Sequence, residues 1–198
     1  GTEANNLALL GMAALAGENQ GHLVASAIEH PCVGEAVDRL QIDGWGVDRA
    51  QPNLQGTVPC PAIESLLRPD TKIVALMLAN NETGAVQPVA EVAGLCGDRD
   101  ILLHTDAAQA VGKIPVDFGK LGVHSLSLAA HKFGGPLGIG ALVLKHGVQV
   151  RPQLFGGHQQ SGTRPGTQTV ALAIGMQKAL EICSQRSREH LAQLAGLR

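Results

Sequence analysis

The chain has 198 residues, of which 44% are hydrophobic, and a formal net charge of -2, which fits one globular domain with a sizeable core. Its Lys and Arg residues are scattered and only 2% of its residues are aromatic, which argues against nucleic-acid binding by a basic patch or by base stacking. The longest apolar run, residues 7–17, is too short to span a membrane.

Helix-like and strand-like segments alternate along the chain, judged by the spacing of apolar residues. We predict, in chain order, a helix over 3–16, a strand over 22–28, helices over 33–40 and 62–67, a strand over 73–78, a helix over 89–96, strands over 101–103, 125–129 and 139–144, and a helix over 169–197. This alternation favours an α/β fold with a mostly parallel sheet covered by helices. Right-handed crossovers bring the carboxyl ends of successive parallel strands to one edge of such a sheet.

Two units are expected along the chain. A large domain covers residues 1–168 and is incomplete at its N-terminus, because the sequence starts with Gly1 rather than Met and shows no signal peptide. Residues 169–198 form a long helix whose charged stretch, 185–190, leads toward a C-terminal small domain outside the chain. The four cysteines form no C-x-x-C pair and are too widely spaced for a zinc site or a disulfide framework, so we expect a cytoplasmic protein.

Polar residues follow three of the predicted strands: Glu29 and His30, residues 80–82, and residues 104–109. Each has a structural explanation alone, such as a helix cap at Asp106 or a turn at 80–81. Together, at one edge of a sheet, they are costly to bury without a ligand that uses them. The set therefore indicates a polar cofactor.

Lys132 follows the predicted strand over 125–129 and precedes a turn that contains Gly134, Gly135 and Pro136. Open α/β sheets bind ligands at this end of a strand, and burial there would lower the pKa of the amine and make it a nucleophile. The alternative is an exposed lysine that begins a turn. Lys132 and Asp106 on neighbouring strands are the amine and the carboxylate that pyridoxal phosphate requires.

Six motifs resemble, in order and spacing, the class V aminotransferase family, and within it the cysteine desulfurase and selenocysteine lyase branch. They are TEANN (2–6), EH (29–30), ANNETG (79–84), HTDAAQ (104–109), HK (131–132) and RPGT (164–167). The resemblance covers nearly the whole chain. It implies the large domain of a fold-type I transferase that binds pyridoxal 5'-phosphate and removes sulfur or selenium from cysteine or selenocysteine, leaving alanine.

The same resemblance implies a role for each matching residue. Lys132 would form a Schiff base with the cofactor and later move protons at the substrate α-carbon. Asp106 would pair with the pyridinium nitrogen, and His30 would stack on the ring. Gln109 would donate a hydrogen bond to the phenolic oxygen, with Asn81 close to that oxygen and the substrate.

The phosphate end also has candidates in the resemblance. Thr2 and the first amides of the first helix would bind the phosphate, as helix N-termini do, and His131 would add a donor. Thr167 matches a threonine that reaches the phosphate of the other subunit, so a homodimer is implied. An amino acid is the expected substrate and a sulfur-acceptor protein an expected partner, with no nucleic acid or membrane involved.

The chain also departs from the family pattern. Ala129 replaces a serine that hydrogen-bonds the phosphate, and His158 and Ser161 replace a usual glycine and a common arginine. No cysteine of the chain matches the catalytic cysteine, which lies on a loop of the small domain with an arginine for the substrate carboxylate. Cys32 is the nearest to the predicted site, and we expect it to be packed at the start of a helix.

Three alternatives remain open. One keeps the cofactor and changes the reaction to transamination or another β-elimination, and a second is a non-catalytic binding or scaffold module that has lost the cysteine loop. The third is an unrelated nucleotide-binding α/β domain, although the glycines over 135–140 have neither P-loop nor G-x-G-x-x-G spacing.

Overall fold

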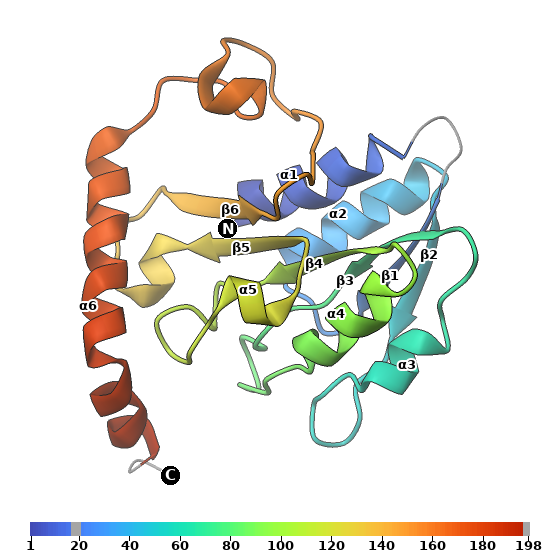
Figure 1. The fold of residues 1–198 in the computed structure, drawn as a ribbon, viewed down its shortest axis with the longest axis horizontal. Helices are drawn as coiled ribbons and strands as arrows, with labels where there is room; N and C mark the ends of the chain where they lie inside the picture. The colour runs from blue at the N-terminus through green and yellow to red at the C-terminus, as the bar shows by residue number, and fades with distance from the viewer. Residues whose placement is uncertain (17–20, 196–198) are drawn as a thin grey trace.

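A computed structural model describes residues 1–16 and 21–195 of the chain, and their side chains as far as Gln185 (Figure 1). Its elements are α1 (Thr2–Ala13), β1 (His22–Ser26), α2 (Pro31–Ile42), β2 (Gly46–Ala50), α3 (Cys60–Glu64), β3 (Thr71–Ala75), α4 (Val89–Gly97), β4 (Leu102–Asp106), α5 (Phe118–Leu121), β5 (Ser125–Ala129), the 3-10 helix η1 (Ala130–Phe133), β6 (Gly140–Leu144), the 3-10 helix η2 (Gln159–Gly162) and α6 (Val170–Ala195).

Each element predicted from the sequence is present, with ends displaced by a few residues. Residues 196 and 197, the end of the last predicted helix, lie outside the described residues. The sequence analysis missed β2 and α5. β2 is a partly exposed edge strand with Asp48 and Arg49 inside it, so it lacks an apolar run, and α5 has only 4 residues.

The described strands form one sheet in the order β2-β1-β3-β4-β5-β6. The first five run parallel, and β6 pairs antiparallel with β5. This confirms the α/β fold with a mostly parallel sheet. The strand order changes direction between β1 and β3, and sheets of this order bind ligands beyond the carboxyl ends of the strands at that point.

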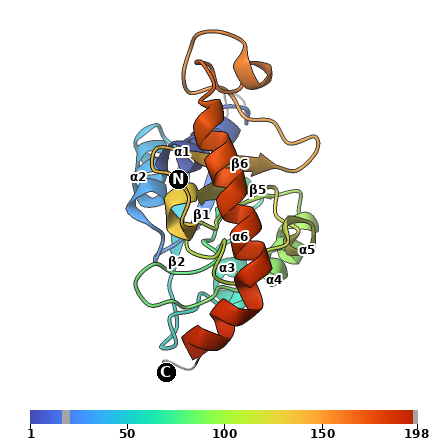
Figure 2. The ribbon, with the colours of Figure 1, turned by 90° about the vertical axis from the view of Figure 1, so that its left-hand side faces the viewer.

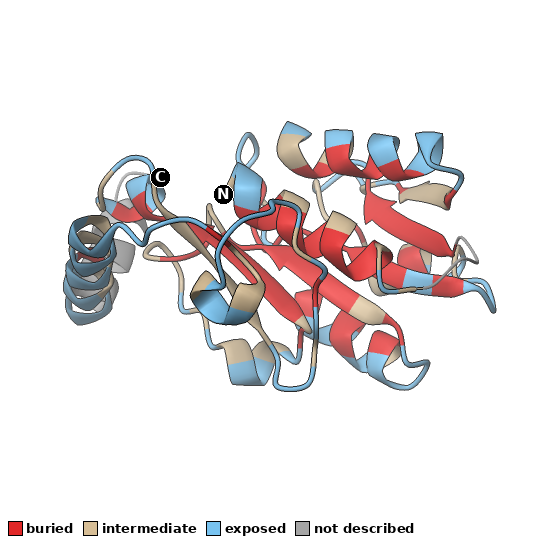
Figure 3. Ribbon diagram, turned by 90° about the horizontal axis from the view of Figure 1, so that it is seen from above, coloured by how far each residue is buried: buried red, intermediate tan, exposed pale blue. Residues whose placement is uncertain are grey.

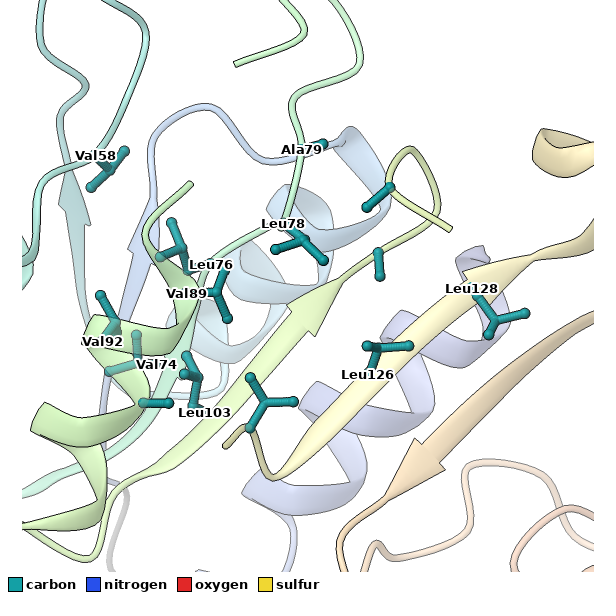
Figure 4. Close-up of a cluster of buried hydrophobic side chains, with 14 of the residues drawn as sticks. Val58, Val74, Leu76, Leu78, Ala79, Val89, Val92, Leu103, Leu126 and Leu128 are labelled. Atoms are coloured by element: carbon teal, nitrogen blue, oxygen red, sulfur yellow. The ribbon is translucent and has the colours of Figure 1, made fainter. Parts of the chain in front are cut away.

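Helices cover both faces of the sheet (Figure 3). α1 and α2 pack on one face, and α3, α4 and α5 pack on the other. Leu23 and Ala25 of β1 face the first pair of helices, whereas Val24 between them faces the second group, as the alternation of a strand requires. Figure 4 shows the apolar cluster between the sheet and α3, α4 and α5, with Val89 and Val92 of α4 against the strands. Two apolar layers therefore hold the strands in register.

The long helix α6 stands beside the sheet, next to η1 (Figures 1 and 2). Cys183 Sγ donates a hydrogen bond to the carbonyl oxygen of Phe133 at 3.3 Å, which joins the helix to η1. Away from this contact α6 exposes Val170 and Ile174, at 62% and 60%. In the described part of the chain, no helix is both long enough and apolar enough to cross a membrane.

Candidate functional site

The polar segments singled out in the sequence all follow the carboxyl ends of neighbouring strands. Glu29 and His30 come after β1, residues 80–82 come after β3, Asp106 is the last residue of β4, and Lys132 lies on η1 directly after β5. Since these four strands are parallel neighbours, the segments share one edge of the sheet. This edge includes the point between β1 and β3 where the strand order changes direction, so it is our candidate site.

Asp106 is a buried carboxylate held only by neutral donors. It is 6% exposed. Asn5 Nδ2 of α1 donates to Asp106 Oδ2 at 2.7 Å, and the amide of Ala108 donates to Oδ1 at 2.8 Å. No basic side chain in the described part of the chain forms an ion pair with it. A buried carboxylate without an internal cation is suited to a cationic ligand.

His30 caps α2 and leaves its ring exposed. Its Nδ1 accepts a hydrogen bond from the amide of Cys32 at 3.1 Å, which places the ring proton on Nε2. Cys32 Sγ lies 3.0 Å from the same Nδ1 and also accepts from Asn5 Nδ2 at 3.1 Å. Burial raises the pKa of the Cys32 thiol, so it stays protonated at neutral pH and is a poor nucleophile. Cys32 is partly buried at the start of α2, as expected.

Lys132 is exposed, as in the alternative that the sequence left open, and the burial that would make its amine a nucleophile is not observed. A second lysine, missed in the sequence analysis, lies nearby. Lys113 is partly buried and donates a hydrogen bond to Gln109 Oε1. Burial lowers the pKa of Lys113, and the nearby charge of Lys132 lowers it further. The structure thus brings Gln109 and Lys132 together around Lys113.

Glu29 joins the ends of β1 and β3. Its Oε1 accepts hydrogen bonds from Ser26 Oγ and from the amide of Met77, both at 2.6 Å. The pKa of this carboxyl is raised to about 7, mainly by burial and also by the nearby Asp106 carboxylate, whereas the two hydrogen bonds act to lower it. Glu29 therefore fixes the segment that ends in His30, a role that the sequence analysis did not assign.

The two asparagines after β3 have different environments. Asn80 is buried and makes a turn: its Nδ2 donates to the carbonyl oxygen of Ile28 at 3.0 Å, and its Oδ1 accepts from the amides of Glu82 and Thr83. Asn81 is exposed, and its side chain is therefore accessible at this edge. The turn explains why a polar residue is buried here and leaves Asn81 as the candidate for ligand contact.

The start of α1 can bind an anion. The helix begins at Thr2, which is exposed, and no side chain of the described residues caps its first amides. A helix N-terminus attracts phosphate through these amides and through its dipole. Ala129 at the end of β5 is adjacent, since a Cβ placed on Gly1 would lie 3.5 Å from Ala129 Cβ. His131 is also exposed, two residues further along the chain.

The loop before α6 is tied to the start of α1 by a bidentate ion pair. Arg164 Nε lies 2.6 Å from Glu3 Oε1, and Nη2 donates to Oε2 at 3.2 Å. This hydrogen-bonded guanidinium lowers the pKa of Glu3. Thr167 is exposed, and within the described residues it makes no recorded hydrogen bond to the other site candidates. A hollow of about 490 Å³ lies between Thr2, Leu154 and this ion pair.

The donor set fits a ligand that has an anionic end and a cationic aromatic end. The uncapped amides of α1 suit a phosphate, and buried Asp106 suits a protonated ring nitrogen. The exposed ring of His30 and the exposed amine of Lys132 provide a stacking surface and a nucleophile. These are the groups that pyridoxal phosphate requires.

Comparisons with known proteins give one consistent result. The family model described as Aminotransferase class-V matches residues 1–196. The cysteine desulfurase IscS of Dictyoglomus turgidum is 38% identical over 198 residues, which are 100% of this chain and 50% of that protein. The solved structure of a NifS-like protein superimposes with a TM-score of 0.92 at 36% identity, and the match covers 95% of this chain and 52% of the other.

A second solved structure, titled SspA in complex with cysteine, has a TM-score of 0.88 at 37% identity, with 91% of this chain and 52% of the other covered. The chain spans about half the length of the curated relatives that match it over all 198 residues. The similarity therefore covers nearly all of this chain and about half of each of these proteins.

Proposed function

This chain belongs to the aminotransferase class-V family, and we propose that it forms the pyridoxal-phosphate-binding half of a cysteine desulfurase. The family depends on this cofactor, and the relatives named cysteine desulfurase are 34% to 39% identical to the chain. The structure of SspA was solved with cysteine, which supports cysteine as the substrate class. Selenocysteine is the second candidate substrate, because it differs only in the atom that is removed.

One observation supports this proposal above the others: Asp106 is a buried carboxylate with neutral donors and no internal cation, at the same sheet edge as Lys132. When bound, pyridoxal phosphate supplies an electron sink whose strength depends on a protonated ring nitrogen. A carboxylate in a low-dielectric site stabilises that positive charge strongly. Asp106 would carry out this role.

The remaining residues would hold the cofactor and the substrate. Lys132 Nζ would bind the cofactor and then carry a proton to or from the substrate α-carbon. His30 would stack on the ring, while Gln109 and Asn81 would orient the phenolic oxygen. Lys113 donates a hydrogen bond to Gln109 Oε1, so the side-chain nitrogen of Gln109 would be the atom that donates to the phenolic oxygen.

At the other end, the first amides of α1 would bind the phosphate together with Thr2 and His131. Thr167 would reach the phosphate bound to a second subunit, so we propose a homodimer. The sulfur of L-cysteine would pass to an acceptor thiol, leaving L-alanine, and an acceptor protein would take it onward. The catalytic cysteine is expected in a C-terminal small domain, outside residues 1–198.

The test uses the full-length protein titrated with pyridoxal phosphate. Wild type should show the absorption band of a lysine-bound cofactor, and Lys132→Ala should lose it. Lys120→Ala is the control: Lys120 is 87% exposed on α5, away from the sheet edge, so its variant should keep the band. The proposal fails if wild type shows no band with saturating cofactor, which is the result expected of a non-catalytic module.

The reaction is tested by its products. A desulfurase should convert L-cysteine to alanine and leave a persulfide, and parallel assays with selenocysteine measure the preference between the two substrates. Formation of pyruvate or another keto acid without persulfide would assign the chain to β-elimination or transamination instead.

A further inference from the structure

We propose that Asn5 and His104 are positioning residues for Asp106, through which α1 and β4 fix the buried carboxylate in the orientation that pairs with the cofactor ring nitrogen. This inference rests on the proposed function. Asn5 and His104 are 0% and 1% exposed, so neither touches substrate or cofactor, and both act through Asp106.

Every hydrogen-bonding position of the Asn5 amide is used. Its Nδ2 donates to Asp106 Oδ2 at 2.7 Å and to Cys32 Sγ at 3.1 Å. Its Oδ1 accepts from His104 Nε2 at 2.9 Å and from Ser127 Oγ. A flipped amide would place its oxygen against the Asp106 carboxylate and its nitrogen against two donors. The Asp106 carboxylate can only accept, so it fixes the Nδ2 end of Asn5 toward itself and leaves Oδ1 facing His104 and Ser127.

The tautomer of His104 follows from the same contacts. Because Nε2 faces an amide oxygen, which only accepts, Nε2 must hold the proton, and Nδ1 then accepts from Ser125 Oγ at 2.8 Å. Burial lowers the pKa of His104, although the nearby Asp106 carboxylate opposes the shift, so the ring stays neutral. A neutral ring donates to Asn5 without adding a positive charge beside Asp106.

The hydrogen-bond network orients Asp106 with neutral groups and so leaves the negative charge of the carboxylate uncompensated. A lysine or arginine next to Asp106 would neutralise the carboxylate inside the chain and weaken its attraction for a cationic ring. Asn5 instead orients the carboxylate with a neutral donor and leaves its full charge for the ligand. Asn5 lies on the face of α1 that also buries Ala8, Leu9 and Met12. Burying a polar side chain there costs free energy unless its hydrogen bonds are satisfied, as those of Asn5 are.

The experiment compares variants of the full-length protein loaded with pyridoxal phosphate labelled with 15N in the ring. Asn5→Leu keeps the number and branching of the side-chain heavy atoms and removes the hydrogen bonds, and His104→Leu removes the donor to Asn5. We expect both to weaken cofactor binding at least about tenfold, the effect of one lost hydrogen bond to a charged group. We also expect the 15N signal of the ring nitrogen to move toward the unprotonated form.

His104→Gln is the conservative variant, because its amide can still donate to Asn5 Oδ1, and it should restore most of the binding and of the 15N signal. His22→Leu is the matched control. His22 is a buried histidine of β1 whose Nδ1 lies 2.8 Å from Thr71 Oγ1, at the opposite end of the strands from the site. It should lower stability in urea without moving the 15N signal, which separates a structural effect from positioning.

The inference is overturned if folded Asn5→Leu and His104→Leu proteins keep the wild-type 15N signal and affinity. The tautomer of His104 can be checked in cofactor-free wild type without any variant. 15N spectra should show a neutral His104 ring at about pH 7 with the proton on Nε2. A His104 ring that titrates at or above about pH 6.5 would also overturn the inference. If wild type binds no cofactor, the proposed function fails and this inference fails with it. If wild type binds but the variants do not differ from it, only the inference fails.

Discussion

Replacing Glu29 by Gln tests the electrostatics of the junction between β1 and β3. Glu29 Oε1 accepts both hydrogen bonds, from Ser26 and from Met77, so the amide oxygen of Gln can keep them. The substitution therefore removes a partly buried carboxylate near Asp106 and keeps these two hydrogen bonds. We expect the variant to be more stable than wild type at alkaline pH.

The magnitude follows from the shifted pKa of Glu29. Its pKa rises from 4.5 in the unfolded chain to about 7 in the folded one, which corresponds to about 3 kcal/mol. The folded protein binds the proton more tightly, so unfolding releases it, and the contribution of Glu29 to stability falls as pH rises through this window. The loss is complete above about pH 7 and absent below about pH 4.5.

Urea unfolding at about pH 5, 6 and 8 measures this dependence. The free energy of unfolding of Glu29→Gln should exceed that of wild type by up to about 3 kcal/mol at the highest pH, and the difference should fall to about 1 kcal/mol at the lowest. Glu35→Gln, at an exposed position of α2, is the control and should match wild type throughout. Equal stabilities of Glu29→Gln and wild type at about pH 8 would refute the reasoning.

Two further pairs of substitutions separate structure from ligand contact. Asn80→Ala should lower the free energy of unfolding in urea by about 2 kcal/mol or more, because it removes the acceptor of the turn. Asn81→Ala should change this free energy by no more than about 0.5 kcal/mol and should weaken cofactor binding instead. The opposite order would contradict the assignment of the two residues. Gly112→Ala should destabilise by about 2 kcal/mol or more, since Gly112 has φ +79° and its new Cβ would lie 2.5 Å from Phe133 Cβ, next to Lys132. Gly34→Ala in α2 meets nothing within 4 Å and should stabilise by up to about 1 kcal/mol; a thermal melt of both variants shows whether the signs differ as expected.

The apolar pattern was sufficient to predict the elements of the core but not those at its margin. β5 lies at the predicted residues, 125–129, and all five are buried, including Ser125 and Ser127. β2 and α5 were missed because one is a partly exposed edge strand and the other is a single helical turn. An apolar pattern measures burial, so an element that buries little leaves no such pattern.

The candidate site was predicted in part for the same reason. Residues that follow buried strands, such as Asp106 and Lys132, could be placed at one sheet edge from the strand pattern alone. The sequence left burial and exposure of Lys132 both open, because burial at that edge depends on what packs over it. The partnership of Asn5 with His104 joins residues 99 positions apart. One signal was present: Asn5 interrupts the apolar face of α1, where a polar residue needs buried partners.

The start of α1 shows how the departures from the family pattern can be compatible with an anion site. Ala129 supplies no hydroxyl there, so backbone amides, Thr2 and His131 would be the donors to a phosphate at that end. Glu3, in the first turn, carries a negative charge that would repel a phosphate. Its bidentate pair with Arg164 offsets this charge and joins segments 161 residues apart. We therefore expect the loop before α6 to favour anion binding at this helix terminus, because the dipole and the first amides of α1 would then face an anion without an unpaired carboxylate beside them.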